Sequence, residues 1–353
     1  MNWLQKTNSP LIISGPCSAE SEAQLLETAK QLTEANRVSV IRAGIWKPRT
    51  RPNAFEGVGE IGLSWLKKVK EATKLPVCTE VATAKHVELC LNYDIDFLWI
   101  GARTTASPFA VQEISDALRG IDIPVMIKNP TSPDLELWIG AIERIARSGI
   151  TKIAAIHRGF SSFEKSVYRN IPMWEIPIEL KRLNPQLDIL CDPSHIAGSR
   201  QLIFEVCQKA LDLNFSGLMI ESHHDPDNAL SDSKQQITPD ILSKIAKKLI
   251  VRDVSSPNIQ FQTELDVLRS QIDVIDRSIT EKIADRMQLV EKIGQFKKSN
   301  NVTILQVERW NEITNHLLDW GKSLGLSEPF IQKLLRSIHE ESIRKQEEIM
   351  NKK

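Results

Sequence analysis

The sequence predicts a parallel (β/α)₈ barrel followed by an all-α region. Eight short, β-rich apolar runs alternate with helical patterns over about the first 250 residues. Charged side chains follow most of these runs, and beyond about residue 262 the pattern becomes purely helical. A doubly wound open sheet is the competing architecture, but it would spread those charges along an edge. A barrel gathers the carboxyl ends of all its strands at one face, and we therefore favour it.

The expected strands cover residues 11–15, 38–43, 77–81, 97–100, 125–128, 153–156, 188–191 and 217–221. Amphipathic helices are expected between them, at 20–36, 64–73, 84–92, 135–148 and 200–213. Residues 57–62 match G-x-G-x-x-G, but they follow a loop and not a strand. A dinucleotide-binding turn is therefore not expected there.

The charge balance and the cysteines limit the class of protein. The chain has 353 residues, 45 of them basic and 45 acidic, which argues against a partner that is a nucleic acid or a membrane surface. No apolar run is long enough to span a bilayer, and the polar start of the chain does not resemble a signal peptide. The five cysteines are odd in number and form no CxxC pair. We therefore expect no disulfide framework and a cytoplasmic location.

Cationic side chains recur where the expected strands end. The second strand runs into Arg42, Lys47, Arg49 and Arg51 within ten residues, and these charges repel one another unless an anion lies among them. A solvated loop is the alternative for this stretch, but it does not explain the recurrence. The cations at strand ends are Arg42, Lys47, Arg103, Lys128 and Arg158. Such a set suits substrates that carry two phosphates and a carboxylate.

Metal-ligand residue types also follow the first, seventh and eighth strands. They are Cys17, His195, Glu221 and Asp232. Thiolate, imidazole and carboxylate donors together indicate one divalent transition metal, such as Mn, Fe, Co or Zn. A buried structural thiol and a loop histidine are the alternative interpretation. A metal with this ligation could polarise an aldehyde for carbon–carbon bond formation.

Eight motifs between about residues 10 and 245 resemble the type Iβ family of 3-deoxy-D-arabino-heptulosonate 7-phosphate (DAHP) synthases. They are GPCS at 15–18, RAG at 42–44, KPRT at 47–50, IGAR at 100–103, KNP at 128–130, HRG at 157–159, DPSH at 192–195, and Glu221 with ALSD at 229–232. The resemblance implies condensation of phosphoenolpyruvate with erythrose 4-phosphate, which opens the shikimate pathway to aromatic amino acids. It also implies that the four donors named above hold the metal, with manganese favoured.

The same resemblance assigns the substrate contacts. Phosphoenolpyruvate would be held by Arg42, Lys47, Arg103, Lys128 and Arg158, and the aldose phosphate by Lys47, Pro48, Arg49 and Thr50, with Asp192 near its hydroxyls. Lys47 is also the expected catalytic residue of the barrel. The sister synthase that uses arabinose 5-phosphate typically has a Lys-Ala-Asn-type loop here, so KPRT favours erythrose 4-phosphate. A Schiff-base aldolase acting through Lys128 or Lys47 is the alternative. No regulatory domain is expected before the barrel, because its first strand begins near residue 11.

The tail has a different organisation. We expect a barrel domain at 1–250, a polar linker at 251–262 and a helical domain at 263–353. One amphipathic helix at 263–299, about 55 Å long, is followed by helices at 306–324 and 328–350. The first helix is too long for a core of its own, so we expect a homo-oligomer, at least a dimer. A dimerisation arm without activity is the alternative.

Two cations share a face of the long helix. Arg286 and Lys297 are eleven residues apart, and both side chains could bind the same ligand. Arg269 precedes Arg286 by seventeen residues, roughly 25 Å along the axis, so only an antiparallel partner chain could bring an equivalent arginine to that ligand.

The tail resembles the all-helical chorismate mutases in the residues Arg269, Arg286, Lys297, Arg309, Ser342 and Gln346. By that resemblance, Arg286 and the partner subunit's Arg269 clamp the two carboxylates of chorismate. Lys297 and Gln346 donate to the ether oxygen during the rearrangement to prephenate, which needs a compact conformer and oriented donors. Trp310 replaces a glutamate common in that class and Gln306 an aspartate, so we expect Glu308 or Gln306 to contact the substrate hydroxyl.

A second hypothesis keeps the synthase and makes the tail a dimerising sensor of chorismate or prephenate. Because pathway enzymes joined in one chain suit feedback control, we also expect allosteric coupling between the two domains.

Overall fold

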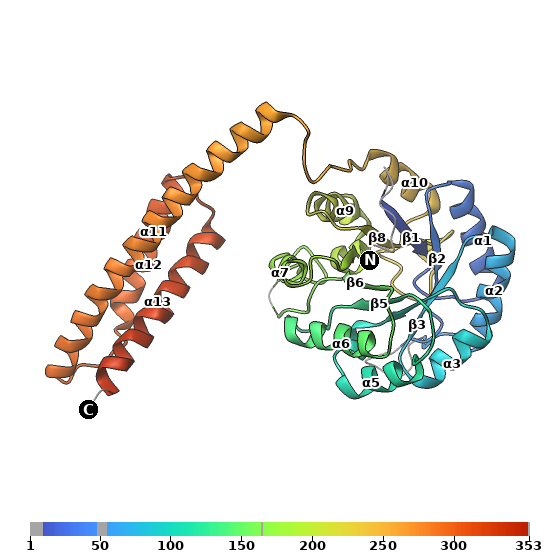
Figure 1. Ribbon diagram of the computed structural model, residues 1–353, viewed down its shortest axis with the longest axis horizontal. Coiled ribbons are helices and arrows are strands. Elements are labelled where there is room, and N and C mark those ends of the chain that lie inside the picture. The colour runs from blue at the N-terminus through green and yellow to red at the C-terminus, as the bar shows by residue number, and fades with distance from the viewer. Residues whose placement is uncertain (1–9, 48–54, 164, 352–353) are drawn as a thin grey trace. The chain divides into compact units, whose positions relative to one another are not determined.

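Eight parallel strands close into a barrel in chain order in the computed structural model (Figure 1). The structure describes residues 10–47, 55–163 and 165–351. The strands are β1 Leu11–Gly15, β2 Val40–Arg42, β3 Val77–Val81, β4 Phe97–Ile100, β5 Val125–Lys128, β6 Ile153–His157, β7 Asp188–Cys191 and β8 Gly217–Glu221. The barrel closes where β1 pairs with β8, with Gly15 opposite Glu221. The predicted barrel is thus confirmed, although β2 is shorter than expected and β6 is one residue longer.

Helices form a ring outside the strands (Figure 1). They are α1 Glu22–Glu34, α2 Ile61–Thr73, α3 Ala84–Asn92, α5 Pro108–Ala117, α6 Leu135–Arg147, α7 Glu175–Leu183, α9 Ile203–Asp212 and α10 Pro239–Lys248. Two short helices, α4 Ala102–Thr105 and α8 Pro193–Ala197, directly follow the carboxyl ends of β4 and β7. Side-chain caps determine the residue at which several of these helices begin. α1 begins two residues later than expected because Ser21 accepts a hydrogen bond from the backbone N–H of Gln24. The expected helix from residue 200 begins instead as a 3₁₀ turn, Arg200–Leu202.

The barrel has two apolar layers because successive strand residues point to opposite faces. One layer lies between the strands and the surrounding helices and includes Leu25, Leu63 and Trp138. The other fills the barrel interior and consists of Ile13, Val40, Cys78, Trp99, Met126, Ala154, Ile156, Leu190 and Met219. This filled interior leaves the carboxyl ends of the strands as the place for a site.

The chain divides into two compact units, Met1–Val254 and Ser255–Lys353. The second contains three helices, α11 Ile259–Ser299, α12 Val307–Ser323 and α13 Glu328–Asn351, and both α11 and α12 pack against α13. Helix α11 begins four residues earlier than expected because the Asn258 side chain accepts a hydrogen bond from Phe261 N–H at 3.1 Å. Residues 259–262, assigned to the linker above, are therefore its first turn.

Only the second half of α11 is packed within this unit. Met287, Val290 and Gly294 are buried. In the first half, Leu268, Ile272, Ile275 and Ile279 are each more than half exposed. No helix among the described residues has the length and apolar character to cross a membrane.

Candidate active sites

A pocket of about 290 Å³ lies among residues from the carboxyl ends of the strands. Five of its lining side chains are cations: Lys47, Arg103, Lys128, Arg158 and Arg169. Four of these were expected from the sequence. The fifth expected cation, Arg42, ends β2 and is almost fully buried. The pocket therefore suits a polyanionic ligand.

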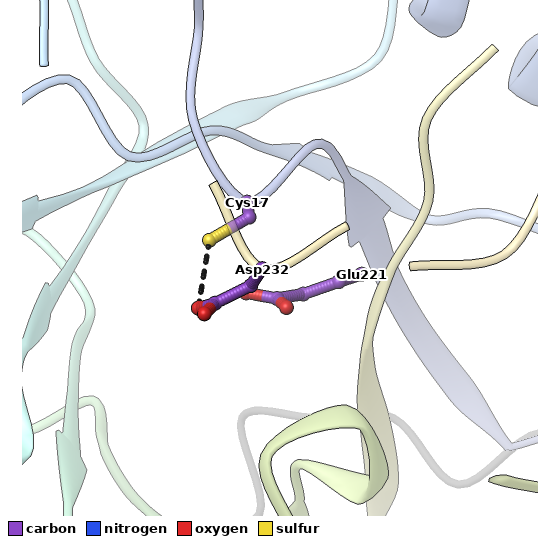
Figure 2. A group of neighbouring side chains, drawn as sticks. All are labelled: Cys17, Glu221 and Asp232. Atoms are coloured by element: carbon purple, nitrogen blue, oxygen red, sulfur yellow. Dashed lines mark hydrogen bonds between the residues drawn. The ribbon is translucent and has the colours of Figure 1, made fainter. Parts of the chain in front are cut away.

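Three potential metal ligands meet at the same end of the barrel. The sulfur of Cys17 and carboxylate oxygens of Glu221 and Asp232 all lie within 4.8 Å of one another. Figure 2 shows the Cys17 thiol directed at the Asp232 carboxylate, where Sγ lies 3.3 Å from Oδ2, with Glu221 beside them. These residues come from the two ends of the barrel domain, and closure of β1 against β8 brings them together.

His195, the fourth expected ligand, borders this group. It lies on α8, and its Nδ1 is 3.8 Å from Oε1 of Glu221 and 2.8 Å from Oδ2 of Asp192. The contact with Asp192 lacks hydrogen-bond geometry, so Nδ1 is a buried nitrogen without a hydrogen-bond partner among the described residues. Such a nitrogen near Glu221, which itself belongs to the group of a thiol and two carboxylates, fits the ligand set of a divalent transition metal.

The charges around the group favour ionised carboxylates. Burial raises the pKa of Glu221, but His195 and Arg42 outweigh burial and hold that pKa at about 2. Burial and the nearby Glu221 raise the pKa of the Cys17 thiol to about 12. A cation coordinated by Cys17 would take it as the thiolate, so metal binding would release a proton.

Buried ion pairs hold two of the strand-end cations. Arg42 donates to Oε1 of Glu221 at 2.8 Å. Lys128, at the end of β5, pairs with Oδ2 of Asp192 at 2.7 Å. Asp192 also accepts a hydrogen bond from the His195 backbone N–H, which caps α8. Its carboxylate is thus engaged with Lys128 in this structure, whereas the sequence analysis placed it near the aldose hydroxyls.

The other cations are held in different ways. Lys47 donates to Sγ of Cys17 at 3.1 Å. Arg158 donates from its guanidinium to Oδ1 of Asn170 at 2.9 Å and from its backbone N–H to Oδ1 of Asn129 at 2.7 Å. Arg103 lies on α4, exposed at the pocket. Three further expected contacts, Pro48, Arg49 and Thr50, lie outside the described residues.

Two residues that connect these groups were not expected from the sequence. Arg169 donates to Oδ1 of Asp232 at 3.0 Å and to Oε1 of Gln235 at 2.6 Å. Gln235 in turn donates to Oε2 of Glu221 at 2.6 Å. Arg169 lies eleven residues beyond Arg158 in a long loop and Gln235 is uncharged, so a search for charges at strand ends overlooks both.

A second candidate site lies within the helical unit. Arg286 of α11 donates to the Ser342 hydroxyl of α13 at 2.7 Å. Gln346, one turn later, is buried, and its Oε1 has no hydrogen-bond partner among the described residues. The two helices approach closely at Gly294, where an added Cβ would lie 3.3 Å from Cγ of Gln346. Burial lowers the pKa of Arg286, which indicates a partly desolvated cation.

The remaining expected mutase residues are not gathered there. Lys297 donates to the backbone carbonyl of Ile304 at 2.5 Å. Arg309 is exposed and pairs with Glu312 on its own helix, at 2.9 Å. Arg269 is also exposed and pairs with Asp266 at 3.4 Å. Within one chain, the structure therefore brings together only part of the set expected from the sequence.

Comparison with protein families gives two matches on the chain. Residues 5–255 match the family described as "DAHP synthetase I family". Residues 268–347 match the family described as "Chorismate mutase type II". The first match covers the barrel and the second covers most of the three-helix unit.

Individual relatives resemble the barrel. A phospho-2-dehydro-3-deoxyheptonate aldolase of Thermotoga maritima is 34% identical over 238 residues, which are 67% of this chain and 68% of the relative. A 2-dehydro-3-deoxyphosphooctonate aldolase of Syntrophotalea carbinolica is 27% identical, over 70% of this chain and 92% of the relative. The crystal structure of the Thermotoga maritima aldolase, a DAHP synthase, superposes with a TM-score of 0.61 and 32% identity, over 69% of this chain and 68% of that one.

Proposed function

This chain belongs to the DAHP synthetase I family and carries a type II chorismate mutase domain, and from this we propose where its two reactions take place. It condenses phosphoenolpyruvate with erythrose 4-phosphate and water to give DAHP and phosphate, and it rearranges chorismate to prephenate. Both reactions belong to aromatic amino-acid biosynthesis. We assign the first to the barrel, 1–250, and the second to the helices, 263–353.

The observation that supports the barrel site is the meeting of a cationic pocket with a cluster of metal-ligand residues at the strand ends. We assign the phosphate and carboxylate of phosphoenolpyruvate to Arg42, Lys128 and Arg158, with Arg103 at the mouth. Their charges would hold the anion close to Lys47, whose ammonium could give a proton to the aldehyde oxygen.

The family depends on a metal, and the donors present here fit one. We assign its ligands to Cys17, His195, Glu221 and Asp232, with manganese favoured. A bound divalent ion supplies Lewis acidity that polarises the aldehyde of erythrose 4-phosphate. The pocket cations would orient both phosphate groups, and the filled barrel interior closes the pocket from beneath.

Gln235 offers a test of the metal site that does not depend on turnover. Replacing it with leucine removes the donor to Glu221 and the acceptor of Arg169, so we expect a 10- to 100-fold loss of manganese affinity. Equilibrium dialysis with detection of free manganese by electron paramagnetic resonance measures this. Gln112→Leu, which removes hydrogen bonds to Asp116 and Arg144 on outer helices, is the control and should bind manganese normally. Equal affinities in the two variants would contradict the assignment.

For the mutase we propose a homodimer in which α11 pairs with its counterpart. The exposed apolar side chains in the first half of that helix support this, because they form a stripe that no described residue of their own unit covers. Arg269 lies in this half, so the partner subunit's Arg269 could join Arg286 on the carboxylates. Lys297, Arg309, Ser342 and Gln346 would complete the site.

We also propose that the two sites communicate and that the enzyme is cytoplasmic. All five cysteines are free and buried, which supports a reducing compartment. Joining two enzymes of one pathway in a single chain suits feedback by chorismate or prephenate on the first of them.

A paired assay tests both the assigned halves and their coupling. The intact chain and a chain ending at Val254 are assayed for phosphate release from phosphoenolpyruvate plus erythrose 4-phosphate, and for loss of chorismate absorbance. We expect both chains to make DAHP and only the intact one to consume chorismate. Prephenate should slow DAHP synthesis in the intact chain alone. Equal inhibition of the two chains would refute coupling through the helical unit.

A further inference from the structure

One buried residue contacts three charged side chains of the barrel site. Trp99 lies in β4, is fully buried, and belongs to the apolar cluster inside the barrel. The Arg42 guanidinium carbon lies 4.8 Å from its ring centroid, and Nζ of Lys128 lies 5.8 Å from it. Its indole Nε1 donates to Oε2 of Glu80 at 2.9 Å. One indole thus contacts groups from β2, β3 and β5.

The ring determines the position of Arg42 in particular. Two buried cations near one another repel, and each has a carboxylate partner, Glu221 for Arg42 and Asp192 for Lys128. Arg42 donates to Glu221 through NH1 alone, and its Nε has no partner among the described residues. A desolvated cation is also attracted to the face of an indole. The ring therefore adds a contact to a guanidinium that has few hydrogen bonds of its own.

The indole N–H also fixes Glu80, a carboxylate that lines the cationic pocket. Glu80 lies against Gly101, where an added Cβ would be 2.1 Å from its Oε1. Without the hydrogen bond from Trp99, this carboxylate could turn to a pocket cation such as Lys47, with whose charge it already interacts, and compete with an anionic ligand.

We propose that Trp99 is a positioning residue for phosphoenolpyruvate: its indole sets the places of Arg42 and Lys128 and keeps Glu80 from neutralising the cationic pocket. This inference rests on the proposed assignment of those cations to phosphoenolpyruvate. It predicts that Trp99 governs binding of this one substrate. The rate constant at saturation and the KM for erythrose 4-phosphate depend on it much less.

The test compares two fully buried tryptophans in the intact enzyme. Trp99→Phe keeps a ring but removes the N–H, and Trp99→Leu removes both. Trp138→Phe is the control, because Trp138 donates to the backbone carbonyl of Ile127 and lies outside the barrel interior. We expect KM for phosphoenolpyruvate to rise about tenfold in Trp99→Phe and further in Trp99→Leu. We expect kcat and KM for erythrose 4-phosphate to stay within about threefold, and Trp138→Phe to leave all three constants within that range.

Calorimetric titration with phosphoenolpyruvate alone, together with thermal unfolding, separates binding from folding. The proposal predicts weaker binding for Trp99→Phe than for Trp138→Phe at a similar melting temperature. Adding Glu80→Gln to Trp99→Phe should recover part of the affinity. If Trp99→Phe binds phosphoenolpyruvate like the wild type, or if only kcat falls, the proposal is wrong. A wild-type enzyme that binds no phosphoenolpyruvate would instead reject the assigned substrate site.

Discussion

Replacing Cys17 with alanine is expected to lower kcat for DAHP synthesis by on the order of a thousandfold, because the metal would lose its only sulfur ligand and the reaction its Lewis acid. Lys47 would also lose the sulfur to which it donates. Phosphate release from the two substrates measures the rate, and atomic emission of the dialysed protein measures the bound metal. Both should fall together in the variant.

The matched control for this substitution is Cys90→Ala. Cys90 is also a buried free thiol, but it lies on α3 in the outer apolar layer, so its loss should leave metal content and rate unchanged. Chelation of the wild-type enzyme should abolish the activity, and manganese should restore it. A Schiff-base aldolase would keep its activity after chelation, and borohydride would trap its imine intermediate. Full activity of Cys17→Ala with a normal metal content would show that the Cys17 sulfur is not a metal ligand.

Replacing Arg286 with alanine should lower chorismate turnover by roughly 10² to 10³-fold, because a partly buried cation held by Ser342 is a prearranged donor to a substrate carboxylate. DAHP synthesis should persist. Loss of absorbance by chorismate measures the first reaction and phosphate release the second. Arg344→Ala is the control, since Arg344 is exposed and pairs with Glu341 and Glu348 on its own helix. Wild-type protein that binds chorismate without converting it would favour the sensor hypothesis.

Mixing two inactive variants tests whether the mutase site is shared between subunits. If the partner subunit's Arg269 completes the site, Arg269→Ala and Arg286→Ala chains that exchange at random should regain activity at about a quarter of the sites. Each mixed dimer then has one site with both arginines and one with neither. No recovery after confirmed exchange would show that the site does not combine Arg286 of one subunit with the partner subunit's Arg269.

The barrel could be predicted closely because its signals are local. Strands such as β3 and β8 were expected with the bounds found, since an apolar run between turn residues identifies a buried strand. The convergence of Cys17 with Glu221 and Asp232 was also predictable. Parallel strands closed in a ring bring their carboxyl ends to one face, however distant the residues are in sequence.

Other features depended on contacts that sequence spacing does not encode. Gln235 is uncharged and Arg169 lies well beyond its strand, so neither was expected at the metal group. The first turn of α11 was assigned to the linker, because the cap by Asn258 was not recognised. In the sequence, Trp99 looks like any other apolar residue of a buried strand, and its contact with Arg42 is not evident there.

The sequence by itself determined which segments are the eight strands, the order of the barrel, and most of the charged residues that reach its carboxyl end. These follow from periodicity and from the geometry of parallel strands. Tertiary structure alone decided the pairings: Arg42 with Glu221, Lys128 with Asp192, and the Trp99 indole among them. Such pairings depend on side-chain conformations and close packing between distant segments, which exist only once the barrel has closed.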